Sequence, residues 1–180
     1  MRLLVSSVVS LLVSSGALAA DAHYALDPSR STLEYQFTQA GALNKGKFTK
    51  YTVTLDVAGD APSKLDVVIE MSSLDTGDKE RDDTLKTADL FAVARFPQSR
   101  FTSTQITRTA NGYDAAGKLT IRGVSKDVHV PFTFSPANGS LMGKVTLKRL
   151  DYGVGQGDWK ATDQVGNDVV VNYALRLAAH

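Results

Sequence analysis

The amino-acid sequence predicts an all-β protein, an eight-stranded antiparallel barrel with one short surface helix between the third and fourth strands. Apolar and polar residues alternate with period two through most of the chain, as in strands with one buried face. Turn-forming residues separate these segments, and Asn111-Gly112 is the strongest hairpin signal. Closing such hairpins into a barrel removes exposed edge strands. A two-sheet sandwich stays open as the alternative architecture.

The stretch from Gly117 to Phe134 shows both faces of one hairpin. Before its turn, Leu119 and Ile121 alternate with polar residues, and after the turn Val130 and Phe132 do the same. One face of the hairpin is therefore apolar, and the other is expected to face water.

Eight segments of the chain show this alternation. The predicted strands cover residues 32–38, 47–57, 65–71, 99–109, 113–122, 127–134, 140–148 and 168–177. Residues 24–28 are expected to form an extended segment ahead of the first strand, and residues 39–46 a loop with two glycines.

The alternation breaks over residues 76–90, where we expect the helix. Asp78 is placed to cap its start, and Lys86 comes late, as the helix dipole favours. The apolar content is thin, with Leu85 and Leu90 as its main members. Such a helix should lie on the surface and cover an opening or an edge of the barrel.

The first nineteen residues are predicted to be a secretory signal peptide. A short positive start at Arg2 precedes the apolar run Leu3–Val13, and small residues follow it. We expect cleavage after Ala19 or Ala20, which leaves residues 20–180 as a single domain. These features predict export to the periplasm.

Charge and cysteine content narrow the classes of partner. The chain has 20 basic and 19 acidic residues and no cysteine. Removing the leader removes Arg2 and no acid, so the mature chain is neutral. Neutrality argues against a nucleic-acid partner. No integral membrane segment is expected after processing, because no other apolar segment is long enough.

Motifs for catalysis or metal binding are not found. The three histidines are His23 and His180 near the ends and His129, which is predicted on the wet face of its strand. Zinc-binding spacings and the G-x-S-x-G elbow are missing. The glycine-rich run at residues 153–157 lacks the ending of a phosphate loop and is expected to be a loop at the barrel rim. We therefore predict no metal, no catalytic residues and no enzymatic activity.

Five stretches in order along the mature chain resemble the YceI family of exported, lipocalin-like barrel proteins. They are Tyr24–Pro28, Gly46–Phe48, Arg81-Asp82 with Leu85, Phe91 and Phe96-Pro97 behind it, Gly117–Val128, and Arg149–Gly153. Many members of the family carry a histidine before the position of Ser31 and another after the first strand, whereas this chain has Arg30 and Thr38–Gly41 there.

The resemblance implies an elongated apolar lumen that binds a polyisoprenoid, a quinone tail or a fatty-acid amide, with no other cofactor. Ten residues are expected in its wall: Phe37, Leu55, Ile69, Phe101, Leu119, Ile121, Val130, Phe132, Leu147 and Tyr173. Leu85, Phe91 and Trp159 are expected to act as lids. Some relatives stand beside a membrane b-type cytochrome, which implies a quinone-linked role.

Other functions stay open at this point. The leading hypothesis is an exported protein that sequesters or carries a long apolar lipid. The alternatives are an accessory protein or enzyme that acts on a quinone-like substrate, and a binding module with a packed core and functional loops. Both a monomer and a homodimer fit the sequence.

Overall fold

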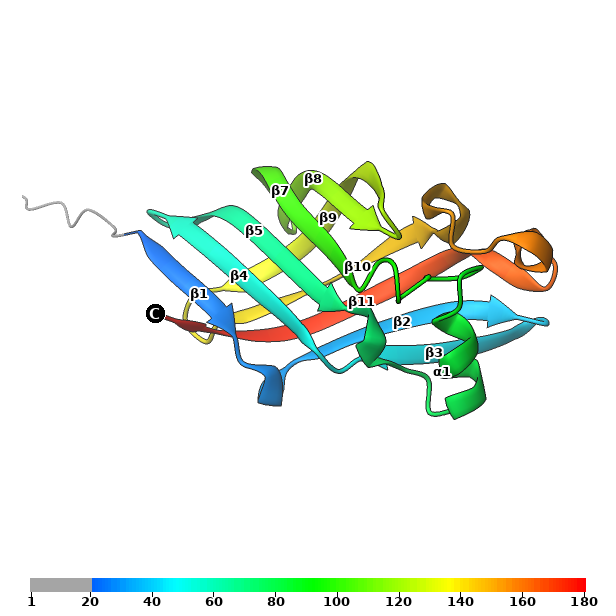
Figure 1. Ribbon diagram of the computed structural model, residues 1–180. Helices are drawn as coiled ribbons and strands as arrows, with labels where there is room; N and C mark the ends of the chain where they lie inside the picture. Colours follow the sequence, from blue (N-terminus) through cyan, green and yellow to red (C-terminus); the bar gives the residue numbers. More distant parts are fainter. Residues whose placement is uncertain (1–20) are drawn as a thin grey trace, which may run out of the picture.

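The computed structural model describes residues 21–180, which form one antiparallel sheet of eleven strands (Figure 1). The predicted signal peptide, residues 1–19, and its cleavage sites at Ala19 and Ala20 lie outside the described residues. The strands are β1 (Ala22–Leu26), β2 (Thr32–Gln39), β3 (Ala42–Phe48), β4 (Tyr51–Ala58), β5 (Ala61–Glu70), β6 (Leu74–Asp75), β7 (Gln98–Thr109), β8 (Gly112–Ile121), β9 (Val124–Ser135), β10 (Ser140–Lys148) and β11 (Val165–Ala179).

Eight of these strands close into a barrel, in the order β1, β4, β5, β7, β8, β9, β10 and β11. Strand β1 closes the ring because it pairs with β4 along one edge and with β11 along the other, where Tyr24 faces Leu55 and Ala179. Strands β2, β3 and β6 continue the sheet outward from β11. The predicted eight-stranded antiparallel barrel is confirmed, with β1 in the closed ring and the predicted strand 32–38, β2, paired outside it.

Several segments differ from the sequence-based expectation. Residues 22–26 pair as β1 instead of forming only an extended lead, and residues 42–46, expected as a loop, form β3 together with residues 47–48. The predicted strand 47–57 is therefore divided between β3 and β4, and residues 74–75 pair as β6. The sequence does not predict β3, because this strand has no alternating apolar face. Leu43 is exposed, and β3 is held by its hydrogen bonds to β2. The turn before it is made by Ala40 and Gly41, both at positive φ.

The helix is α1 (Lys79–Leu85), shorter than the predicted 76–90. Its start agrees with the expected cap, since the Asp78 side chain accepts a hydrogen bond from the Arg81 amide at 3.1 Å. After Lys86 the chain forms turns and three 3-10-like hydrogen bonds instead of continuing the helix. One of these turns ends at Ala92, whose φ is 49°, a conformation that an α-helix cannot contain.

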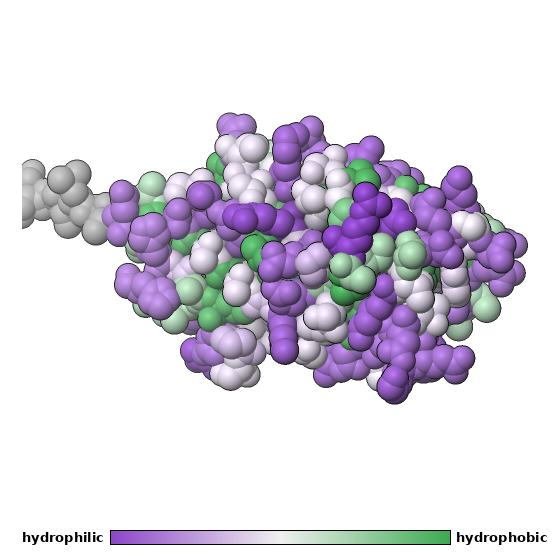
Figure 2. Space-filling model, viewed as in Figure 1, coloured by the Kyte–Doolittle hydropathy of each residue, from purple (hydrophilic) through white to green (hydrophobic). Residues whose placement is uncertain are grey.

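The barrel is packed at one end and hollow at the other. The packed end lies around β1 and the last residues of β11, where Leu55, Val57 and Leu177 are buried. Helix α1 and the loop after β10 lie at the opposite end (Figure 1). Hydrophilic residues cover most of the face in Figure 2, with small hydrophobic patches between them. No helix within residues 21–180 is long and apolar enough to cross a bilayer.

Candidate functional site: an apolar lumen

The hollow end of the barrel contains a cavity of about 440 Å³. Strands β2, β3, β4, β5, β7, β8, β9, β10 and β11 contribute to its wall, and α1 and the loop after β10 contribute to its cover. The volume falls in the range of about 300–1,000 Å³ that is typical of small-molecule sites. The barrel therefore encloses a binding-sized space and not only a packed core.

Most of the residues predicted in the wall and lids lie around this cavity. They are Phe37, Ile69, Leu85, Phe91, Phe101, Leu119, Ile121, Val130, Leu147, Trp159 and Tyr173. Leu55 and Phe132 were also expected in the wall, but they belong to the packed core, with exposed fractions of 0% and 3%. Alternation placed both side chains inside the barrel, but it does not show at which height the interior is hollow.

Strand register explains why the alternating pattern located the wall. Leu147 of β10 lies opposite Val169 of β11, which in turn lies opposite Phe37 of β2. The next inward row toward the packed end contains Val171 and Tyr35. Because side chains alternate between the two sides of a sheet, each such row presents apolar groups to the lumen.

Two segments cover the hollow end and are tied to each other. Leu90, Tyr152 and Val154 form a buried cluster, against which Phe91 and Trp159 pack. The Gly155 and Gln156 amides both donate hydrogen bonds to the main-chain oxygen of Asp89, at 3.0 and 2.8 Å. The segment after α1 and the loop after β10 therefore form one joined cover, in the region where the lids were expected.

Arg149 is a buried cation in the lumen wall, with an exposed fraction of 6%. Its five N–H groups all donate to main-chain oxygens: Gly166 at 3.0 Å, Val154 at 2.9 Å, Trp159 and Val165 at 2.7 Å, and Ala161 at 3.4 Å. Burial lowers the pKa of the guanidinium below its usual value, although arginine stays charged near neutrality. Arg149 thus fastens the loop after β10 and has no donor left for another molecule.

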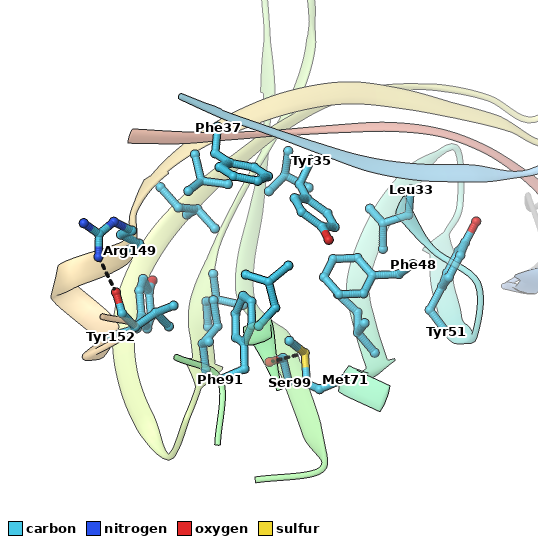
Figure 3. A pocket seen from close by; sticks show the side chains of 18 of the residues that line it. Leu33, Tyr35, Phe37, Phe48, Tyr51, Met71, Phe91, Ser99, Arg149 and Tyr152 are labelled. Carbon is cyan, nitrogen blue, oxygen red and sulfur yellow. Dashed lines mark hydrogen bonds between the residues drawn. The ribbon is translucent and has the colours of Figure 1, made fainter. Parts of the chain in front are cut away.

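Other polar side chains in the lumen include Ser99, Tyr173 and Tyr35. The Ser99 hydroxyl donates to Sδ of Met71 at 3.0 Å (Figure 3), and the Tyr173 hydroxyl donates to the main-chain oxygen of Pro131. The Tyr35 hydroxyl has no hydrogen-bond partner among residues 21–180. Burial raises the pKa of both Tyr35 and Tyr173 well above that of free tyrosine, so both phenols are protonated near neutrality.

The lumen offers little for acid–base or metal chemistry. Within residues 21–180, no group of three His, Cys, Asp or Glu side chains could hold a metal ion. His129 lies on the outer face, as expected, and its Nδ1 is 2.6 Å from a carboxylate oxygen of Asp114. An arrangement of apolar side chains with protonated phenols is suited to enclosing an apolar molecule.

Residues 24–177 match the family model described as the YceI-like domain. The chain belongs to the YceI-like family. It is 34% identical over 130 residues to a UPF0312 protein of Pectobacterium atrosepticum, covering 70% of this chain and 68% of that protein. A UPF0312 protein of Yersinia enterocolitica is also 34% identical, over 132 residues, which cover 71% of this chain and 69% of the relative. The predicted resemblance is confirmed.

Solved structures share the fold of this YceI-like protein. The crystal structure of BcnA from Burkholderia cenocepacia superposes with a TM-score of 0.79 at 29% identity, over 85% of this chain and 99% of BcnA. A polyisoprenoid binding domain from Saccharophagus degradans superposes with a TM-score of 0.64, over 87% of this chain and 98% of that domain. The second pair is 19% identical, so it establishes likeness of fold alone.

Several lumen residues of this YceI-like protein escaped the prediction of wall and lids. They are Leu33, Tyr35, Phe48, Tyr51, Val53, Leu65, Val67, Met71, Ser99, Leu141, Val145, Arg149, Tyr152, Val154, Val165, Val169, Val171 and Leu175, together with the rim residues Gln39, Asp78, Glu80, Arg81, Thr84 and Leu90. Most of the apolar ones lie on the inward face of predicted strands, so period two could have found them. Arg149 gives no such signal, because a lone cation after a strand is usually exposed.

Proposed function

We propose that this YceI-like protein encloses a long apolar lipid in its lumen, such as a polyisoprenoid, a quinone-type lipid or a fatty-acid amide. The observation that carries the proposal is the cavity of about 440 Å³ with apolar residues from nine strands in its wall. Burying apolar surface contributes about 25 cal/mol per Å², so a tail in this lumen gains affinity without polar contacts. The shared fold with a polyisoprenoid binding domain supports the same assignment.

The proposal describes a binding protein and not an enzyme. The titratable side chains at the centre of the lumen are phenols whose pKa values are raised by burial, which makes them poor acids or bases near neutrality. In an exported protein, such a lumen would sequester the lipid or carry it through an aqueous compartment. Export, a periplasmic location and a membrane b-type cytochrome partner stay predictions from the sequence.

The first experiment is extraction of the purified full-length mature protein with organic solvent, followed by mass spectrometry, and native mass spectrometry after incubation with polyprenols and quinones. We expect one apolar lipid per chain. A protein that carries no lipid and takes up none of these compounds would contradict the proposal.

A matched pair of variants tests whether the lipid occupies the lumen. Leu147 lines the cavity, whereas Thr146, one position earlier on β10, is exposed on the outer face. Leu147→Trp should fill part of the cavity and reduce uptake at least tenfold, because displaced apolar contacts are lost. Thr146→Trp should leave uptake within about twofold. Equal effects of the two variants would place the lipid elsewhere.

A further inference from the structure

The hydroxyl of Tyr35 is a buried polar group without a hydrogen-bond partner in the part of the chain that the structure describes. Tyr35 has an exposed fraction of 6% and lines the cavity. Its ring is stacked near Phe37, with centroids 6.2 Å apart, and lies 5.0 Å from the Phe48 ring. Figure 3 shows the Tyr35 hydroxyl pointing inward from β2, toward Phe48. Within residues 21–180 no acceptor lies within hydrogen-bond distance of this hydroxyl, although the charges of Asp82, Asp75 and Arg81 act on it.

Tyr173 differs from Tyr35 in this respect. Tyr173 also lines the cavity and has an exposed fraction of 8%, but its hydroxyl is satisfied by the main-chain oxygen of Pro131. A buried hydroxyl without a partner destabilises the protein that contains it. A bound molecule that brings an acceptor oxygen to Tyr35 would remove this penalty.

The charged side chains at the cover indicate whether the polar group of a bound lipid is neutral or anionic. Asp78, Glu80 and Arg81 of the α1 region line the cavity mouth. Residues 75–86 contain five acidic and three basic side chains, and Lys47 of β3 pairs with Asp75 at 3.6 Å, which leaves one net negative charge. The buried cation at Arg149 has no free donor, because all five of its N–H groups are bonded to main-chain oxygens. A phosphate or carboxylate would meet net negative charge at the mouth and no free cationic donor at Arg149.

We propose that the lumen selects a neutral oxygen-bearing lipid, such as an alcohol, quinone or amide, whose oxygen accepts a hydrogen bond from the Tyr35 hydroxyl. This inference rests on the proposed function, which it deepens by naming the chemistry of the polar group. The lipid tail supplies the affinity, and the Tyr35 hydroxyl distinguishes lipids that share the same tail.

Three compounds with one branched isoprenoid skeleton test the proposal: phytol, phytane and phytyl phosphate. They carry a neutral oxygen, no oxygen and an anionic group respectively. Their affinities are measured for the mature protein and for Tyr35→Phe by competition with a fluorescent lipid. We expect Tyr35→Phe to lower the ratio of phytol affinity to phytane affinity about three- to tenfold, the size of one buried hydrogen bond. Phytyl phosphate should bind at least tenfold more weakly than phytol.

Thermal unfolding of the lipid-free proteins separates this role from a purely structural one. Tyr35→Phe removes an unsatisfied group, so its melting temperature should equal or exceed that of the wild type. Tyr173→Phe breaks an existing bond and should melt a few degrees lower. It should also leave the phytol-to-phytane ratio within about twofold.

Several results would overturn the inference while leaving the proposed function intact. One is a phytol-to-phytane ratio that is unchanged in Tyr35→Phe. Another is phytyl phosphate binding as tightly as phytol. If the wild type takes up none of the three compounds or any longer polyprenol, the proposed function itself fails, and this inference fails with it.

Discussion

The ring of Tyr35 lies directly against Gly46 of the neighbouring strand. The two residues face each other in the register of β2 and β3, and a Cβ atom on residue 46 would stand 2.4 Å from Cζ of Tyr35 and 2.5 Å from its hydroxyl oxygen. Such distances are far inside van der Waals contact. Glycine at position 46 is therefore what allows the phenol to lie flat against the wall and leave the lumen open.

Gly46→Ala should force the Tyr35 ring out of its position. Because overpacking a well-packed site costs about 1–3 kcal/mol, we expect a decrease of that size in the free energy of unfolding, measured by urea denaturation. Gly166→Ala is the control, since a Cβ there would meet Thr38 at 3.4 Å, an ordinary contact. It should change the free energy by no more than about 0.5 kcal/mol. If Gly46→Ala lowered the free energy of unfolding no more than Gly166→Ala, the Tyr35 ring would be free to move away from residue 46.

Alkaline conditions should destabilise the fold through two of the lumen phenols, Tyr35 and Tyr173. Burial raises the pKa of Tyr35 and Tyr173 in the folded protein, whereas in the unfolded chain both ionise near pH 10. Above that pH the unfolded state loses protons that the folded state keeps, so stability falls as pH rises. Each phenol should contribute a slope of about 1.4 kcal/mol per pH unit.

The measurement is the free energy of unfolding in urea between pH 9 and pH 11. Above pH 10, Tyr35→Phe and Tyr173→Phe should each make the decrease of the unfolding free energy with pH less steep by about 1.4 kcal/mol per pH unit. Below pH 9 only Tyr173→Phe should be less stable than the wild type, because only that variant loses a hydrogen bond. A slope that neither variant changes would mean that both phenols ionise normally in the folded protein.

The sequence was sufficient to predict the barrel and most of its wall, because both depend on alternation along single strands. Leu147, Ile69 and Phe101 could be placed inside from their neighbours alone. Leu55 was placed inside correctly but at the wrong height, since it faces Tyr24 at the packed end. Which level of a barrel is hollow depends on how side chains from several strands meet, which one strand's pattern does not contain.

Other parts of the site depend on contacts between distant segments. The network of Arg149 joins a strand end to main-chain oxygens as far along the chain as Gly166. The close approach of Tyr35 to Gly46 requires β3, a strand without an apolar face. Neither feature has a local sequence signature, although the stretches around Gly46 and Arg149 were among those that predicted the family.

Arg149→Lys should release the loop after β10. A lysine has three donors on one nitrogen and cannot reach five oxygens spread around the guanidinium, so several buried carbonyl groups lose their partner. We expect the free energy of unfolding to fall by about 2–4 kcal/mol. Amide hydrogen exchange should increase most in residues 153–166.

The control for this prediction is Lys160→Ala, which removes an exposed cation from the same loop and should change neither measurement by much. If Arg149→Lys left exchange in residues 153–166 unchanged, the loop would be held by its apolar cluster and not by the guanidinium. Unchanged stability with faster exchange would show that the network orders the loop locally without supporting the barrel.

Trp159 should report directly on occupancy of the lumen. It is the single tryptophan of the chain, it lines the cavity, and it packs against the buried clusters of both Tyr35 and Tyr152. A lipid that enters the lumen replaces water near the indole with hydrocarbon. We expect its emission to shift to shorter wavelength on addition of phytol, and to be quenched by a quinone-type lipid in contact with the ring.

Lipid binding and the change in Trp159 emission can be measured independently of each other. Titration of the Leu147→Trp variant is unsuitable because it adds a second indole, so the control is Trp159→Phe, which should bind lipid by native mass spectrometry without a spectral change. If the wild type binds lipid with no change in emission, the cover formed by residues 153–166 does not contact the occupant. The lipid would then lie against the strand wall alone, beneath a cover that only excludes water.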